Sequence, residues 1–172
     1  MKKLSHKLKV PFLLSFLGYL CLQSSIAAAD SINLSTFKVI PVAKVLVSQD
    51  IVLKNTLGQT VTLKRGGDGE PPRGPVNIQF RNDPRAKKGV FEMRFDNHTA
   101  NFWLDEEINL NERTGLPANI ATLKSHPARS GQGIGVQSIL NSNPRAPKTL
   151  HLLLNDQHGQ VLGELEIQSI DD

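Results

Sequence analysis

Cysteine is nearly absent from this chain, since Cys21 is the only one among its 172 residues. One cysteine cannot close a disulfide within the chain, and it cannot supply a zinc site built on several thiolates. Cys21 also lies in an N-terminal segment that we expect to be removed. The residues before it, Tyr19 and Leu20, lack the small side chain that lipoprotein signals place there. We therefore expect a cysteine-free mature protein without thiol chemistry.

The first 29 residues have the order of a secretory signal peptide. Four lysines and no acidic residue precede an apolar stretch at 12–22, and Ala27-Ala28-Ala29 follows it. The apolar stretch is shorter than the roughly 20 residues that cross a bilayer as a helix. We expect cleavage after Ala29, which leaves residues 30–172 as one exported domain in the bacterial periplasm or outside the cell; the alternative is an uncleaved anchor. No later segment is apolar enough to span a membrane.

A surplus of one charge is also absent once the signal is set aside. The chain has 20 Lys and Arg and 16 Asp and Glu, and four of the lysines lie in the signal, so 16 residues of each sign remain. A chain with equal numbers of basic and acidic residues has no overall positive potential that would attract nucleic acid. Aromatic residues are few as well, with five Phe and one Trp after residue 29. Stacking of bases or sugars is therefore disfavoured, and we expect no nucleic-acid partner.

Alternation of apolar and polar residues takes the place of long apolar runs. Side chains alternate between the two faces of a strand, so this period of two predicts strands with one buried face. The firmest prediction is a hairpin over about 90–105, with Asn97-His98 at its turn. Other strands are predicted at 37–47, 50–54, 59–65, 76–81, 149–155 and 160–169.

The segments between these strands are rich in Gly, Pro and Asn, which favour turns and loops. Pro117 can begin a short helix that ends near Lys124. Many short strands joined by turns, without alternating helices, predict an all-β, mainly antiparallel fold. We expect an immunoglobulin-like or jelly-roll β-sandwich with one short helix near 117–124.

The stretch ARSGQGIGVQSIL, residues 128–140, resembles a phosphate-binding loop because three glycines stand at alternate positions. A dinucleotide fingerprint has the spacing G-x-G-x-x-G, directly after a strand and at the start of a helix. Here the third glycine, Gly135, comes one residue early, and Ser125-His126-Pro127 stands where a strand is needed. We therefore predict a glycine-containing strand or bend, and no nucleotide or other cofactor.

Two histidines stand in predicted hairpin turns, each two residues after an aspartate. These are Asp96 with His98 and Asp156 with His158. If both turns lie at one end of the sandwich, their carboxylates and imidazoles suit a divalent transition metal. The alternative is that Asp and Asn simply favour turns and that the histidines are exposed there. The spacing D-x-H is not diagnostic of a metal site.

Sequence motifs of the common hydrolases are missing. The chain has no G-x-S-x-G turn and no H-E-x-x-H helix. The acidic run Asp105-Glu106-Glu107 stands at a predicted strand end, where adjacent acids are usually solvated. A small exported hydrolase acting on envelope material remains the alternative function, because any fold can place an acid and a base together.

Trp103, the only tryptophan, is the first candidate contact residue. The alternation places it opposite Phe102 on the polar face, together with Asn101 and Asp105. An outward tryptophan suits a binding interface. The alternative is that a loop, a helix or another sheet covers the ring.

Five cations form a local basic cluster beside this hairpin. They are Arg81, Arg85, Lys87, Lys88 and Arg94. Their charges can be balanced by four acidic residues further along the chain, Asp105, Glu106, Glu107 and Glu112. One interpretation is an electrostatic surface that faces a protein or an anionic envelope component; the other is ordinary solvated loop charge. Taken together, the sequence predicts an exported, non-catalytic binding protein such as an accessory envelope factor, an inhibitor or a secreted virulence factor.

Overall fold

The computed structural model describes residues 38–66, 75–141 and 143–168. All of these residues belong to one compact unit. The signal expected at 1–29 therefore lies outside the described residues. Every strand pairing in the described part is antiparallel, which confirms the predicted all-β class. No helix of the described segments has the length and apolar character needed to cross a membrane.

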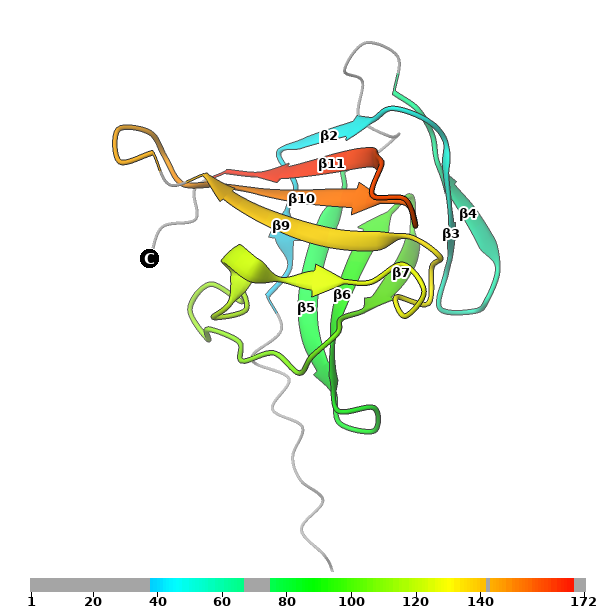
Figure 1. Ribbon diagram of the computed structural model, residues 1–172, viewed down its shortest axis with the longest axis horizontal. Coiled ribbons are helices and arrows are strands. Elements are labelled where there is room, and N and C mark those ends of the chain that lie inside the picture. Colours follow the sequence, from blue (N-terminus) through cyan, green and yellow to red (C-terminus); the bar gives the residue numbers. More distant parts are fainter. Residues whose placement is uncertain (1–37, 67–74, 142, 169–172) are drawn as a thin grey trace, which may run out of the picture. The chain divides into compact units, whose positions relative to one another are not determined.

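Two larger sheets form a sandwich, and a hairpin extends from it (Figure 1). Sheet A has the strand order β1-β5-β6-β7, and sheet B has the order β2-β11-β10-β9-β8. The strands of sheet A are β1 (Ile40–Pro41), β5 (Asn77–Asp83), β6 (Lys88–Phe95) and β7 (His98–Trp103). Those of sheet B are β2 (Lys44–Val47), β8 (Lys124–Ser125), β9 (Gly135–Asn141), β10 (Thr149–Asn155) and β11 (Val161–Ile167). The hairpin pairs β3 (Ile51–Lys54) with β4 (Thr60–Leu63).

The sandwich is built from two meanders, in which strands consecutive in the chain pair with each other. These are β5-β6-β7 in sheet A and β9-β10-β11 in sheet B. The expected long strand over 37–47 is divided into β1 and β2, because the chain turns after Pro41 from one sheet into the other. On the opposite side, the Asp105 amide donates to the Lys124 carbonyl at 3.2 Å, which joins the end of β7 to β8.

One core lies between the sheets, and alternation along the strands fills it. Phe80, Phe91 and Phe102 are directly opposite one another on β5, β6 and β7, and all three are fully buried. Their ring centroids are 5.5 and 5.3 Å apart in tilted arrangements, which are favourable for aromatic pairs. Sheet B contributes a row of fully buried leucines, including Leu150, Leu152, Leu154 and Leu165.

The helix expected near 117–124 is only a three-residue 3-10 helix, η2 (Ile120–Thr122). Its turns are closed by the Ile120 amide to the Pro117 carbonyl and by the Thr122 amide to the Asn119 carbonyl. Leu123 then takes an extended conformation and the chain enters β8, which pairs with β9. Pairing with a strand thus ends the helix that Pro117 begins.

Candidate functional site

The polar side of sheet A brings most of the predicted binding residues together. Because the phenylalanines point into the core, the intervening residues of β5, β6 and β7 share the opposite side, here named the sheet A outer face. Strand register arranges them in three rows, Asn77–Arg94–Thr99, Gln79–Glu92–Asn101 and Arg81–Val90–Trp103, with Asp83 opposite Lys88 beside the β5–β6 turn. Five predicted binding residues therefore lie on this face, and Arg85 and Lys87 occupy the turn at its end.

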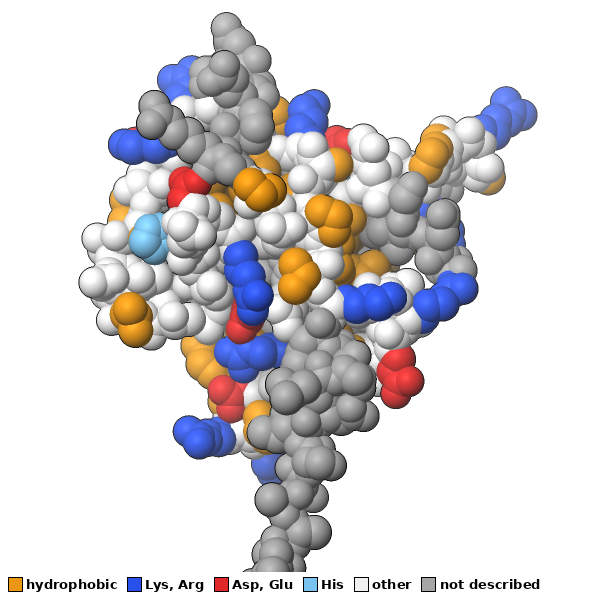
Figure 2. Space-filling view, turned by 180° about the vertical axis from the view of Figure 1, so that it is seen from behind, with side chains coloured by type: hydrophobic (Ala, Val, Ile, Leu, Met, Phe, Trp, Pro, Cys, Tyr) orange, Lys and Arg blue, Asp and Glu red, His pale blue; other side chains and the backbone are white. Residues whose placement is uncertain are grey.

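Glu92 is the centre of this face. Its Oε1 lies 2.6 Å from Arg81 Nε, and its Oε2 lies 3.2 Å from Arg94 Nη2. The Glu92 side chain is only 9% exposed, so its charge depends on these two partners. Figure 2 shows basic and acidic side chains alternating on one side of the molecule. Two of the five predicted cations are thus bound within the sheet, by an acid that the sequence analysis did not single out.

The β5–β6 turn presents the remaining cations. The Asp83 carboxylate accepts hydrogen bonds from the Arg85 and Ala86 amides at 2.9 and 3.3 Å, which fixes the turn. Lys87 has a positive φ of 49°. Arg85 and Lys87 are exposed and Lys88 is half-buried. None of the three forms an ion pair with another described residue.

Trp103 lies at the margin of the sheet A outer face and is half-buried. Its amide donates to the Ser130 carbonyl at 2.8 Å, and the Ser125 hydroxyl donates to the Trp103 carbonyl at 2.6 Å. Gly131 packs so closely that a Cβ there would lie 3.0 Å from Trp103 Cδ1. A loop therefore covers part of the indole, and the rest remains open to solvent.

Gln132 anchors that loop to two strands. Its Oε1 accepts the Lys54 amide at 2.7 Å, and its Nε2 donates to the carbonyls of Lys54 and Asn101 at 3.0 and 2.7 Å. One side-chain amide thus pairs with the end of β3 as a neighbouring strand would, and it also holds β7. Gln132 could not be predicted as an anchor, because a glutamine between two glycines carries no signal of such a role.

The glycine-rich stretch contains a bend followed by a strand. Gly131 and Gly133 have φ values of 82° and 74° in the loop, and Gly135 begins β9. A Cβ on Gly135 would lie 2.4 Å from the Ser125 carbonyl oxygen, so close approach of two backbones requires glycine there. A strand rather than a helix follows the loop, which differs from the context of a dinucleotide fingerprint.

Asp105, the last of the predicted binding residues, lies just beyond β7. Its Oδ1 is 3.6 Å from Arg129 Nε and 3.4 Å from the His126 amide nitrogen. Glu106 and Glu107 are exposed beside it. Asp105 therefore pairs with the neighbouring loop instead of answering the basic cluster.

Each of the two Asp-x-His turns has a local structure of its own. Asp156 Oδ1 accepts the His158 and Gln160 amides at 2.8 and 2.9 Å and so closes the β10–β11 turn. Asp96 has a φ of 47° in the tight β6–β7 turn that precedes His98. Across the described ranges, no three His, Cys, Asp or Glu side chains are grouped so that they can hold a metal ion.

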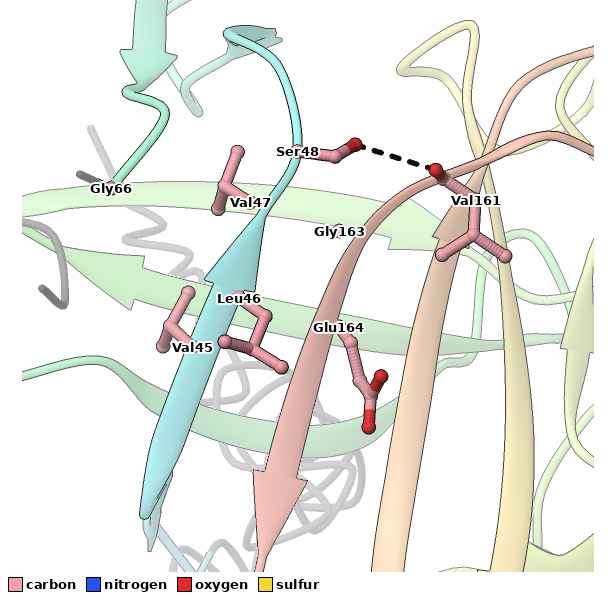
Figure 3. Close-up of a pocket in the computed structure, with 8 residues that line it drawn as sticks. All are labelled: Val45, Leu46, Val47, Ser48, Gly66, Val161, Gly163 and Glu164. Atoms are coloured by element: carbon pink, nitrogen blue, oxygen red, sulfur yellow. Dashed lines mark hydrogen bonds between the residues drawn. The ribbon is translucent and has the colours of Figure 1, made fainter. Parts of the chain in front are cut away.

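The opposite side of the sandwich has a different chemistry. Outward positions of sheet B include Leu46, Ile139 and Val161, whose exposed fractions are 38%, 45% and 44%. Between them, His151 Nδ1 lies 2.6 Å from Glu164 Oε1. A cavity of about 350 Å³ borders β2 and β11 (Figure 3). This surface was not predicted from the sequence.

The described part of the chain thus offers two kinds of contact surface. The sheet A outer face ends in open cations held on a fixed turn, which suits an acidic or anionic surface. The outer side of sheet B presents scattered aliphatic side chains. No protein-family model, no curated protein and no solved structure matches this chain.

Proposed function

We propose that this protein is an exported, non-catalytic binding protein of the bacterial envelope or exterior. Its sheet A outer face and the β5–β6 turn contact an acidic protein surface or an anionic envelope component. The observation that carries this proposal is the pair of exposed, unpaired cations Arg85 and Lys87 on a turn closed by the Asp83 carboxylate.

Charge on this surface supports the proposal. The face and its turn hold five basic residues and two acidic ones, Asp83 and Glu92. Glu92 is occupied by Arg81 and Arg94, so the surplus positive charge is concentrated at the turn. Such a local surplus steers an oppositely charged partner even where the whole chain is balanced, and salt screens the attraction.

The test uses a matched turn in sheet B. Asn143-Pro144-Arg145 closes in the same way as Asp83-Pro84-Arg85, since the Asn143 side chain accepts the Arg145 amide at 3.0 Å. We expect the purified protein to sediment with native envelope fractions in a salt-sensitive manner. The double substitution Arg85→Glu and Lys87→Glu should weaken this binding at least tenfold, roughly 1.4 kcal/mol. The control Arg145→Glu, also exposed, should bind like the unchanged protein.

Two results would count against the proposal. A loss of binding free energy in the control about half as large as in the double variant, in proportion to charge changes of two and four units, would mean that only total charge matters. Unchanged binding in the double variant would move the contact away from this face. Circular dichroism of each variant checks that the fold is kept.

A further inference from the structure

The edges of the two sheets differ in how their backbone groups are satisfied. At the β7 edge, the Trp103 amide bonds to Ser130 and the Asn101 carbonyl bonds to Gln132. At the β8 edge, the Lys124 carbonyl accepts the Asp105 amide. The β1 edge has two residues, one of which is Pro41 and lacks an N–H. The remaining sheet edge is β2.

Strand β2 pairs with β11 on one side only. The Ser48 amide donates to the Leu162 carbonyl at 2.9 Å. Backbone groups of alternate residues in an antiparallel strand point in opposite directions. Leu46 therefore bonds toward β11 like Ser48, and the N–H and C=O groups of Val45 and Val47 point away from it. No other described residue bonds to these outward groups.

The described residues around this edge are largely apolar. The cavity of about 350 Å³ is lined by β2, by Gly66 and by Val161, Gly163 and Glu164. In Figure 3, Val45 and Val47 point to one side of β2, whereas Leu46 points toward β11 and Glu164. The described residues thus leave a row of free hydrogen-bonding groups beside an exposed leucine. An edge of this kind is a template for another strand.

We propose that β2 pairs with β2 of a second copy of this chain, antiparallel and centred on Leu46. In this register Val45 of each copy lies opposite Val47 of the other, and these are the residues whose groups point outward. Two hydrogen-bonded pairs, with four hydrogen bonds, then form across a twofold axis. Leu46 meets its symmetry mate in the pair between them, where side chains approach most closely.

The side chains of the strand fit the same register. Lys44 lies opposite Ser48 of the second copy, so the two lysines are kept apart and no like charges oppose each other. Leu46, 38% exposed in the single chain, gains an apolar partner. The contact uses four-residue strands, so we expect a weak, reversible dimer rather than an obligate one. It lies in sheet B and is separate from the face in the proposed function.

Charge substitutions at Leu46 test the pairing. Leu46→Lys should weaken the dimer at least tenfold in sedimentation equilibrium, because two ammonium groups then oppose each other at the axis. Leu46→Glu should do the same. An equimolar mixture of the two variants should dimerise again, because the opposed charges then attract. The control Ile139→Lys, at an exposed site on β9 away from the edge, should dimerise like the unchanged protein.

A crosslink tests the register directly. In a Cys21→Ser background, Leu46→Cys should form a disulfide-linked dimer under mild oxidation, because paired residues of this kind lie within disulfide reach. Ile139→Cys should not. A protein that stays monomeric up to millimolar concentration overturns the proposal. So does a dimer that survives Leu46→Lys, or a mixture of oppositely charged variants that does not associate.

Discussion

The outer sides of the two sheets differ in how their charged and aliphatic side chains are placed. Each carries a glutamate whose carboxylate lies 2.6 Å from a guanidinium or imidazole nitrogen of a neighbouring strand. Glu92 lies on the inner strand β6 between Arg81 and Arg94 and is 9% exposed, whereas Glu164 pairs with His151 alone and is 30% exposed. On sheet A, Glu92 is thus paired twice, and Val90, the aliphatic residue of its outer face, is fully buried. Sheet B leaves leucine, isoleucine and valine side chains in contact with water.

The neighbouring side chains explain this difference, since β6 and β11 are both inner strands. Glu92 lies between the polar residues Gln79 and Asn101, and two arginines cover its carboxylate, which loses water and needs both partners. Glu164 lies between Leu46 and Leu153 and keeps more contact with water. The network around Glu92 stabilises the sheet and leaves only the turn to bind other molecules. Isolated exposed aliphatic side chains add little to the stability of the fold. They bury apolar surface only when another molecule binds to them. Burial therefore indicates which ion pairs hold the fold together.

The largest effect is expected from the buried carboxylate. Glu92→Gln leaves two arginines without their counterion, and Arg81 is only 26% exposed. We expect a loss of about 2 kcal/mol in the free energy of unfolding, less than for a fully buried pair because Arg94 is 45% exposed. Urea denaturation measures it. The matched change Glu164→Gln should cost less than about 1 kcal/mol. Equal losses would contradict the contrast between the faces.

A smaller effect is expected from the loop that covers Trp103. Gln132→Ala removes the partners of the Lys54 amide and of the Lys54 and Asn101 carbonyls; the bonds to Lys54 are exposed and the bond to Asn101 is partly buried. We expect a loss of about 1 kcal/mol and a red shift of Trp103 fluorescence as the loop leaves the indole. Gln137→Ala, at an exposed position of β9, is the control and should change stability by less than about 0.5 kcal/mol. An unshifted spectrum would show that the loop stays without its anchor.

The smallest effect is expected from the exposed ion pair of the β3–β4 hairpin. The Lys64 ammonium, 2.8 Å away, and the Arg65 amide lower the pKa of Asp50 from its ordinary value of 3.8. A carboxyl whose pKa is lower in the folded state stabilises the folded protein at pH values above its unfolded pKa. This stabilisation is lost as pH falls through the folded-state pKa. The melting temperatures of Asp50→Asn and of the unchanged protein should therefore differ slightly at neutral pH and converge as pH falls through the lowered pKa of Asp50. A difference that grows on acidification would contradict this sign.

Much of the fold could be predicted from the sequence, because alternation records which side of a strand is buried. The segments 149–155 and 160–169 correspond to β10 and β11, and 90–105 corresponds to β6 and β7. The helix at 117–124 could not be judged locally, since pairing of β8 with β9 ends it after one turn. Strand order could not be predicted either, because hydrogen bonding between neighbouring strands produces no periodic pattern in a sequence.

The candidate site was predicted in part. Alternation correctly placed Asn101 and Trp103 on the polar face, and register brings Arg81 and Arg94 beside them. Glu92 was missed, although it shares a face of β6 with Arg94, because only the structure shows that Arg81 reaches the same carboxylate. Gln132 was missed because its three bonds join segments 31 and 78 residues away.

The sequence by itself determined the all-β class, the alternating core and the turns, because these depend on neighbours a few residues apart. The N-D-P-R turn after β5 and the D-x-x-G turn after β10 are local features of this kind. The tertiary structure decided which charges are neutralised and which edge is left open. Both depend on contacts between distant strands: Glu92 is neutralised by an arginine from β5, and β2 remains open because no described strand lies beyond it.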